Sequence, residues 1–306
     1  AVTGDSWFTP GFWSTFTRAR CLTPDAADNP ELFWKRLSAL LKKLGEQHGM
    51  RPILLPMEEA TVKVCLDHAE ELEHLACFLL PDRKSYEIAS NKRRTQEAAE
   101  RLKIDHPRSI EPNSPQALAQ ALDKNLPSKS GWRDFLVKPQ SGSGSHGIMY
   151  SSDLSGAEYW GELWHSYGPL SIQERIPQEG RGLGASLLFD REGRYVSGFV
   201  HERLKEYPVS GGPSTDRKSI RDEKLLADSR RLLESLNWRG VAMVEWKEDP
   251  ISRRKLLLEI NPRFWGSLEL AVRSGADFPR WYALLAQGER LPEGLGYRDG
   301  VRSRWM

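Results

Sequence analysis

The sequence predicts an α/β (α+β) fold in which an antiparallel sheet forms the core and the chain divides into two or three subdomains. Three observations support this prediction. Helical periodicity is clear over residues 30–45, and strand and turn signals dominate from residue 171 to about residue 208. A hairpin pattern that carries acidic residues follows over 241–261. At 306 residues, the chain also exceeds one typical domain.

The composition argues against several classes of partner. Lys and Arg number 44 against 42 for Asp and Glu, so the net charge of +2 gives no electrostatic reason to expect nucleic acid. No apolar run reaches the roughly 18 to 20 residues that a membrane span needs, and the start lacks a signal pattern. We therefore expect no membrane association and a cytoplasmic location. The three cysteines lack a CxxC pattern and indicate reduced thiols.

The first part of the chain, 1–88, has the pattern of a partial α/β domain. Gly and Pro interrupt the apolar pairs of the opening residues, which predicts a loop. A helix over 30–45, a short buried strand over 53–55 and a helix over 58–74 follow. This order predicts an αβα unit of a parallel sheet, in which Gly45 or Gly49 ends the first helix.

The second part, 89–172, combines helices with a glycine-rich strand pair. We predict helices over 91–102 and 114–121 and strands over 135–137 and 148–150. The first of these helices carries Lys92, Arg93 and Arg94 in its first turn, where the helix dipole disfavours cations. Such a cluster either meets an anion or, more commonly, is solvated surface charge.

The third part, 173–306, is expected to form the sheet core. Antiparallel strands are predicted over 171–176, 183–190 and 195–204, followed by a helix over 223–236, the acidic hairpin and an amphipathic stretch over 267–286.

A glycine loop lies between the two strands of the second part. Gly142, Gly144 and Gly147 match G-x-G-x-x-G, but a strand rather than a helix follows them, which favours a phosphate-covering flap over a dinucleotide-binding turn. An ordinary flexible hairpin loop is the alternative. Lys138 ends the preceding strand and either meets a phosphate or extends to the surface. No G-K-[ST], H-R-D or D-F-G sequence occurs, which excludes a Walker A loop and disfavours a protein kinase.

The acidic hairpin predicts a metal site. If its turn centres near Ser252, Glu245 stands opposite Glu259, and Asn261 shares the face of Glu259. Facing carboxylates repel each other unless a cation lies between them, and two carboxylates with an amide oxygen suit Mg²⁺. A bulge would shift this register and turn one acid away. Arg263, two residues further on, would point toward the same site and neutralise a transferring phosphoryl group.

Taken in order, these segments resemble the ATP-grasp superfamily and, within it, the carboxylate-amine ligases. The resemblance covers roughly residues 50–290, and the order and kind of the motifs together make it specific. The motifs are Ser90-Asn91-Lys92, Phe135-Leu136-Val137-Lys138-Pro139 with the glycine loop, Gln173-Glu174-Arg175-Ile176-Pro177, Val241 to Glu245, and Glu259-Ile260-Asn261-Pro262-Arg263.

The resemblance implies a fold in which two subdomains clamp ATP. Its phosphates would meet Lys92, Lys138 and the loop residues Ser141, Gly142, Ser143 and Gly144. The adenine would lie against Gln173, Glu174, Arg175 and Ile176, and Glu179 would contact the ribose. Glu245, Glu259 and Asn261 would hold one or two Mg²⁺ ions, with Mn²⁺ as the alternative metal. Arg263 and Lys138 would be catalytic.

The implied activity is that of an ADP-forming ligase. The enzyme would activate a small-molecule carboxylate as an acyl phosphate and join it to a small-molecule amine, while the closed flap excludes water. Three alternatives stay open with the same fold: a carboxylate-thiol ligase, a carboxylase and a phosphoryl transferase. A non-catalytic nucleotide-binding module is the fourth alternative.

A polar segment between residues 203 and 217 is the candidate for substrate recognition. Cations and glycines suit the binding of a carboxylate, and an exposed loop is the equally weighted alternative. The candidate residues are Arg203, Lys205, Gly211, Gly212 and Arg217.

The N-terminus departs from the family pattern. Members usually begin with a complete βα unit of a Rossmann-like domain, and this chain leaves no room for one before residue 30. We therefore expect either an abbreviated N-terminal pre-ATP-grasp domain or one whose beginning is absent from this chain. A homodimer or a partner chain would complete it.

Overall fold

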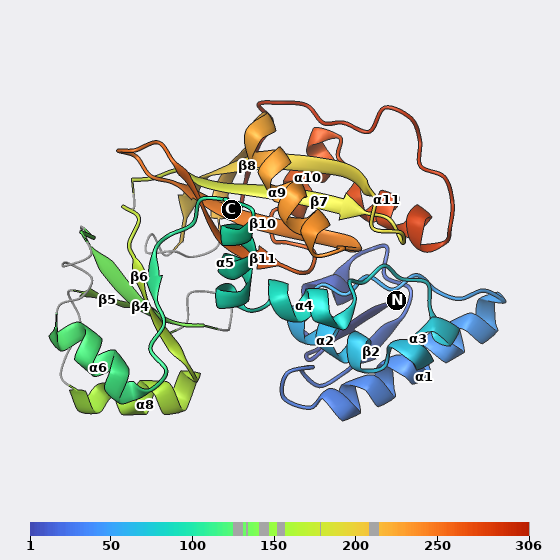
Figure 1. Ribbon diagram of the computed structural model, residues 1–306. Helices are drawn as coiled ribbons and strands as arrows, with labels where there is room; N and C mark the ends of the chain where they lie inside the picture. Colours follow the sequence, from blue (N-terminus) through green and yellow to red (C-terminus); the bar gives the residue numbers. More distant parts are fainter. Residues whose placement is uncertain are drawn as a thin grey trace.

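The computed structural model describes residues 1–124, 131–132, 134–140, 147–151, 157–177, 179–207 and 214–305. Figure 1 shows an N-terminal part, a small four-stranded sheet with its own helices, and a larger six-stranded sheet. Within the described residues, no helix is both long enough and apolar enough to cross a membrane. The mixed α/β architecture with an antiparallel core is the predicted one.

The N-terminal part contains a parallel pair of strands and four α-helices. Its elements are β1 (Val2–Gly4), the short helix η1 (Pro10–Trp13), β2 (Arg20–Leu22), α1 (Pro30–His48), α2 (Glu59–Asp67), α3 (Ala69–Leu75) and α4 (Arg83–Ala89). The Asn29 side chain accepts a hydrogen bond from Leu32 N and caps α1, which ends at Gly49 in the left-handed conformation.

Two predictions for this part are wrong. The helix expected over 58–74 is broken at His68, whose ring stacks on Trp34 of α1 with centroids 4.4 Å apart. The strand expected over 53–55 is reduced to one parallel bridge between Ile53 and Cys77. A ring contact between distant residues leaves no trace in local periodicity.

The four-stranded sheet has the order β3–β6–β4–β5 and carries two helices. Its strands are β3 (Ser109–Ile110), β4 (Phe135–Pro139), β5 (Met149–Tyr150) and β6 (Leu170–Glu174), and its helices are α6 (Pro115–Asp123) and α8 (Ala157–Tyr167). Leu118, Trp160 and Ile172 meet in the core between them. Strands β4 and β5 pair antiparallel across the glycine loop, which confirms the predicted strand, loop and strand order. The predicted subdomain boundary at 172/173 falls inside β6.

The six-stranded sheet is antiparallel throughout and has the order β11–β10–β7–β8–β9–β12. Its strands are β7 (Gly182–Phe189), β8 (Tyr195–Glu206), β9 (Ser214–Ile220), β10 (Gly240–Glu248), β11 (Lys255–Asn261) and β12 (Arg302–Arg304). One face packs on α5 (Lys92–Arg101) and α9 (Glu223–Ser235) through an apolar core. The opposite face packs on α10 (Leu268–Ser274) and α11 (Phe278–Ala286), which replace the single stretch expected over 267–286.

The face under α10 and α11 changes character along its strands. On β10, Val241 and Met243 belong to the apolar core, whereas Glu245, two residues further on, lines a cavity. On β8, buried Phe199 is followed on the same face by His201 and then Arg203. Because every second residue of a strand lies on the same face, the face that packs on α10 and α11 at one end lines the polar cavity at the other.

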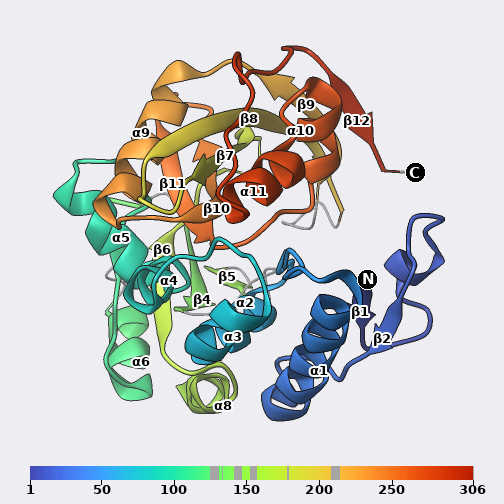
Figure 2. The same ribbon diagram turned by 90° about the vertical axis from the view of Figure 1, so that its right-hand side faces the viewer.

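The N-terminal part docks on the six-stranded sheet and its helices (Figure 2). The Tyr282 hydroxyl of α11 accepts a hydrogen bond from Leu79 N at 2.8 Å and donates one to Leu54 O at 3.1 Å. Gly240 has a positive φ of 76°, and a Cβ there would lie 2.4 Å from Leu79 O. This close backbone approach requires glycine.

Candidate active site

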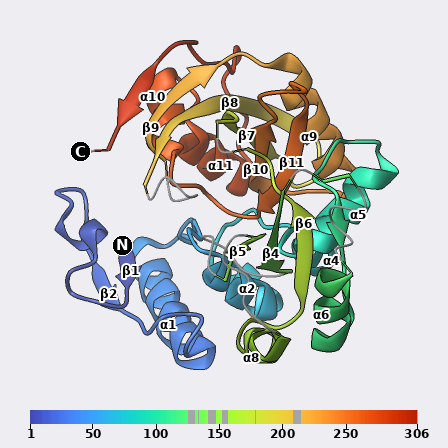
Figure 3. The same ribbon diagram turned by 90° about the vertical axis from the view of Figure 1, so that its left-hand side faces the viewer.

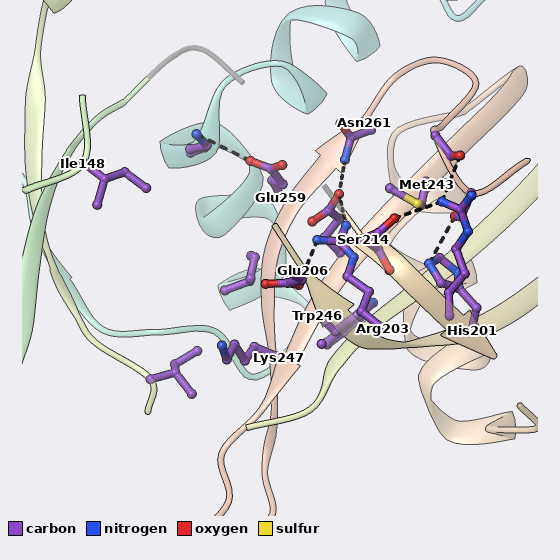
Figure 4. Close-up of a pocket in the computed structure, with 18 of the residues that line it drawn as sticks. Ile148, His201, Arg203, Glu206, Ser214, Met243, Trp246, Lys247, Glu259 and Asn261 are labelled. Carbon is purple, nitrogen blue, oxygen red and sulfur yellow. Dashed lines mark hydrogen bonds and ion pairs between the residues drawn. The ribbon is translucent and has the colours of Figure 1, made fainter. Parts of the chain in front are cut away.

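A cavity of about 810 Å³ lies between the four-stranded and six-stranded sheets. Its walls come from β4, β5 and β6 on one side and from β8, β9, β10 and β11 on the other. Figure 3 shows where these strands lie. Figure 4 shows Ile148 on one wall and Glu259 and Arg203 across from it. Twelve of the predicted site residues line this cavity: Lys92, Lys138, Gln173, Glu174, Arg175, Ile176, Arg203, Arg217, Glu245, Glu259, Asn261 and Arg263.

The remaining predicted residues are not part of this lining. Glu179 is exposed and lines a second cavity of about 400 Å³ together with Arg108 and Asp249. Lys205 is exposed and does not line the first cavity. The predictions for Ser141, Gly142, Ser143, Gly144, Gly211 and Gly212 fall outside the described residues.

The acidic hairpin has the predicted pairing, which a bulge produces. Glu245 lies directly opposite Glu259, and Met243 lies opposite Asn261. Nearer the turn, Trp246 pairs with Leu257, so Leu258 is an extra residue in β11. Without the extra residue, strict pairing from the turn would place Leu258 opposite Glu245 and Glu259 on the other face. The predicted pairing of Glu245 with Glu259 is confirmed. A bulge was expected to turn one acid away, but here the bulge brings the two acids to the same face.

Each hairpin acid contacts a cation. Glu245 Oε1 lies 2.5 Å from Arg203 Nη2 and accepts a hydrogen bond from Asn261 Nδ2 at 3.0 Å. Glu259 Oε2 lies 3.4 Å from Lys92 Nζ. Burial raises the pKa of Glu245. The nearby charge of Arg203 lowers this pKa, and the charge of Glu259 raises it. The two acids and the amide offer the all-oxygen donor set that Mg²⁺ prefers.

This donor set holds only two carboxylates. Among the residues that the structure describes, no group of three or more His, Cys, Asp and Glu side chains is arranged to hold a metal ion. Asn261 Oδ1 also accepts a hydrogen bond from Arg263 Nη2 at 3.0 Å. The geometry therefore suits a cation shared with ligand oxygens and water rather than one enclosed by protein groups.

Two glycines of β7 let side chains of β8 cross toward β10. Gly182 is opposite Arg203 and Gly184 is opposite His201. A Cβ on Gly184 would lie 2.3 Å from His201 Cε1, and one on Gly182 would lie 3.4 Å from the Arg203 side chain. Because these positions lack side chains, Arg203 passes over β7 and reaches Glu245 on β10.

Lys138 is a buried cation on the opposite wall. It lies in β4 with 7% of its surface exposed. Burial lowers the pKa of Lys138 to about 8, Lys92 adds to this effect, and Glu259 and Glu111 oppose it. A buried amine beside another cation is suited to an anionic ligand.

Sequence reasoning missed an acid from the N-terminal part. Glu59 of α2 lies with its Oε1 3.6 Å from Arg263 Nε. Burial raises the pKa of Glu59, Arg263 and Lys92 oppose this, and Glu259 adds to it. The only sequence signal was an acidic residue in the first turn of a predicted helix, which is common at any helix start.

The segment Gln173–Ile176, in which β6 ends at Glu174, is fixed by ion pairs. Glu174 forms a salt bridge with Arg108 at 2.7 Å, and Arg175 forms one with Asp134 at 2.7 Å. The Arg175 guanidinium also lies 4.5 Å from the centroid of the Tyr150 ring. These contacts anchor the segment, which lines the cavity.

Comparison with known proteins identifies the architecture. A family model described as ATP-grasp in the biosynthetic pathway with Ter operon matches residues 200–306. A sequence search of curated proteins gives no match.

Several solved structures share the fold at low sequence identity. Biotin carboxylase from Campylobacter jejuni, in a β-γ-ATP complex, superposes with a TM-score of 0.70 and 14% identity over 94% of this chain and 65% of that one. The biotin carboxylase domain of 2-oxoglutarate carboxylase from Hydrogenobacter thermophilus is described with MgADP, ADP and bicarbonate. It superposes with a TM-score of 0.65 and 15% identity over 87% of this chain and 60% of that one. N5-carboxyaminoimidazole synthetase from Staphylococcus aureus superposes with a TM-score of 0.61 and 12% identity over 85% of this chain and 66% of that one.

The chain thus spans 60 to 66% of the length of these three solved chains. The two sheets, the cavity between them and the family match agree with one another, and together they show that this chain has the ATP-grasp superfamily fold.

Proposed function

We propose that the cavity binds Mg-ATP and that the chain is an ADP-forming ligase, which activates a carboxylate as an acyl phosphate and joins it to an amine. One observation carries the proposal. Lys138 of β4 lies across one cavity from the two acids and the amide of the hairpin, and Lys92 of α5 contacts one of these acids. Solved structures of the same fold are described with MgADP and with an ATP analogue, which supports a nucleotide here.

Each wall of the cavity would take a different part of the ligand. Lys138 and Lys92 would contact phosphates, and Gln173 to Ile176 would line the adenine. Glu245, Glu259 and Asn261 would hold Mg²⁺, or Mn²⁺ as the alternative, which neutralises phosphate charge when bound. Glu179, which the family resemblance places at the ribose, is left out because it lines the second cavity.

The proposed reaction has two steps. A carboxylate oxygen attacks the γ-phosphorus of ATP, the bond to the β-phosphate oxygen breaks, and ADP leaves. The amine then attacks the acyl carbon, loses a proton, and inorganic phosphate departs. Arg263 would stabilise the charge on the transferring phosphoryl group, because its guanidinium lines the cavity next to Asn261.

A second candidate keeps the cavity and changes the carboxylate. The Hydrogenobacter domain is described with bicarbonate, which favours a carboxylase that phosphorylates bicarbonate. The same cavity would also suit a ligase with a thiol acceptor, a simple phosphoryl transferase or a non-catalytic nucleotide-binding module.

An assay of ADP release separates these candidates. The chain is incubated with Mg-ATP and a panel of carboxylates, including bicarbonate, with and without amines or thiols. The ligase proposal expects ADP only when carboxylate and amine are both present. Release of AMP and pyrophosphate would refute the acyl-phosphate scheme, and ADP formed with bicarbonate alone would favour the carboxylase.

A matched pair of variants tests the metal ligands. Glu259→Gln removes one charge from the proposed metal site and should abolish turnover, whereas Glu289→Gln, at an exposed position, should not. Thermal unfolding checks that both variants are folded. A fully active Glu259→Gln protein would remove the metal assignment.

Self-association is a further part of the proposal. The Hydrogenobacter domain is described as a dimer, which supports a homodimer or a pairing with a partner chain here. Light scattering after size-exclusion chromatography measures the mass in solution. A cytoplasmic location also remains a prediction.

A further inference from the structure

Arg217 is a buried cation that faces the cavity without a carboxylate partner in the described part of the chain. It lies in β9 with 7% of its surface exposed. Its Nη1 donates to Ser214 O at 3.3 Å and to Gly266 O at 3.1 Å. Its Nε has no hydrogen-bond partner among the described residues. The six residues before β9, 208–213, contain no acidic side chain.

The other cations at this end of the cavity are paired. Arg203 lies 2.5 Å from Glu245 and 3.5 Å from Glu206. Arg304, which also lines the cavity, lies 2.9 Å from Asp216. Two of the cations predicted for substrate recognition, Arg203 in β8 and Arg217 in β9, therefore differ: Arg203 is bound to the hairpin acid, and Arg217 is available to a ligand.

A desolvated guanidinium without a counterion is unfavourable, and the direction of its pKa shift reflects this. Burial lowers the pKa of Arg217, and Arg203 adds to the effect while Glu269 opposes it. For Arg203 the balance is reversed, because Glu245 and Glu206 outweigh burial and raise its pKa. Residues that break a stability rule in this way are often found at functional sites.

Glu269, the acid that acts on Arg217, is itself paired with Arg273, and the side chains considered next are polar and uncharged. Ser214 and Ser267 line the cavity beside it, and the Ser267 hydroxyl lies 3.1 Å from His201 Nε2. Burial lowers the pKa of His201 to about 3, so its imidazole is neutral near pH 7. Hydroxyl and imidazole groups around one guanidinium suit a single carboxylate or phosphate.

Arg217 is separated from the hairpin acids by the width of several strands. β8 and β7 lie between β9 and β10 in the sheet, so the backbones of Arg217 and Glu245 are three strand spacings apart, or roughly 14 Å. Their side chains lie on the same face, because Arg203 is opposite Arg217 in the ladder and contacts Glu245. One elongated ligand can therefore reach both ends.

We propose that the substrate carries a second anionic group, a carboxylate or a phosphate on a stem, which Arg217 binds while the first carboxylate is activated beside the hairpin acids. This inference rests on the proposed function, and it selects an elongated organic acid over bicarbonate. Arg217 is thus a specificity-determining residue, and Arg203 belongs to the hairpin site.

Calorimetric binding to the full chain with Mg-ADP present tests the proposal. The probes are the α,ω-dicarboxylates from succinate to suberate, ω-phosphonocarboxylates of matched length, and monocarboxylates of matched length. We expect one of the dianions to bind more tightly than its monocarboxylate. The dicarboxylate and phosphonate series show which anion Arg217 prefers.

Two variants in neighbouring positions provide the contrast. Arg217→Met should weaken dianion binding by about 30-fold or more. This ratio corresponds to roughly 2 kcal/mol, the lower bound of the cost of breaking a buried charge pair. Lys218→Met removes an exposed cation one residue along β9 that does not line the cavity, and should leave binding unchanged. If Arg217→Met binds Mg-ADP as the wild type does and unfolds at the same temperature, the variant is folded. Arg217→Lys should restore part of the affinity for the dianion.

The outcomes separate this inference from the proposed function. Equal affinity for monocarboxylates and dianions, or unchanged dianion binding by Arg217→Met, would overturn the role of Arg217, even if ADP forms with a monocarboxylate and an amine. Binding of dianions that depends on Arg217, without ADP release in the presence of any amine, would support the anion site and overturn the ligase proposal.

Discussion

At the scale of single residues, Lys138 makes nucleotide binding dependent on pH. Its pKa of about 8 in the ligand-free cavity is low because burial and Lys92 disfavour the charged amine. Phosphate oxygens favour the charged form, so binding raises this pKa and takes up a proton near pH 8. We predict that affinity for Mg-ADP falls as the pH rises through 8, by up to about tenfold per unit. Calorimetry in buffers of different ionisation enthalpy measures the proton uptake.

Lys138→Arg is the matched control for that experiment. A guanidinium stays charged throughout this range, so the variant should bind Mg-ADP without the proton uptake. The same uptake in wild type and variant would assign the titration to another group.

Glu59 marks the limit of residue-level prediction. Glu245, Glu259 and Asn261 were identified because polar residues interrupt apolar strands in a short hairpin. Glu59 meets Arg263 from a helix about 200 residues earlier, and no local pattern encodes that distance. The charge of Arg217 is visible in the sequence, but only the structure shows that Arg203 takes Glu245 and that no carboxylate of the described residues pairs with Arg217.

At the scale of elements, the alternation of apolar residues predicts the positions of strands with an apolar face but not those of the other strands. Strands β7, β8, β10 and β11 were predicted within a few residues. The sequence pattern does not predict strand β9, because Ser214–Ile220 contains three charged residues and begins inside the polar segment 203–217. It is held in the sheet by β8 and by the contacts of Asp216 with Arg302 and Arg304 of β12. These partners lie more than 80 residues away.

The crossing of β7 by β8 side chains depends on Gly184. A Cβ at this position would lie 2.3 Å from the ring of His201, which is buried and unable to move freely, whereas at Gly182 it would lie 3.3 Å or more from longer, flexible side chains. We predict that Gly184→Ala lowers the free energy of unfolding by about 1 to 3 kcal/mol, as overpacking does. Gly182→Ala should cost clearly less. Chemical denaturation of both variants measures the difference, and equal losses would contradict the crossing as described.

At the scale of the whole molecule, the site is assembled from all three parts of the chain. The four-stranded sheet supplies Lys138, the six-stranded sheet supplies the hairpin acids, and the N-terminal part supplies Glu59. The antiparallel core and the ATP-grasp fold were predictable from motif order. The docking of the N-terminal part was not, because it depends on contacts such as that between Tyr282 and Leu79 that join the two ends of the chain.

Glu59 offers a test of whether the N-terminal part acts in the proposed reaction. We predict that Glu59→Gln lowers kcat roughly ten- to hundredfold, because Arg263 loses a charged partner whose contribution is about 1.5 to 3 kcal/mol. Glu58→Gln changes the exposed neighbour and should be neutral. Both variants should unfold at the wild-type temperature, and KM for ATP should change little.

The pH profile distinguishes this role from a structural one. Because burial raises the pKa of Glu59 above its usual value of 4.5, the wild-type carboxylate becomes protonated earlier on acidification than an exposed one. Protonation removes the charge that faces Arg263, so kcat should fall on the acid side, and Glu59→Gln should lack that step. A variant with reduced kcat and an unchanged acid limb would mean that Glu59 only packs against Arg263, and that a different acid controls the reaction.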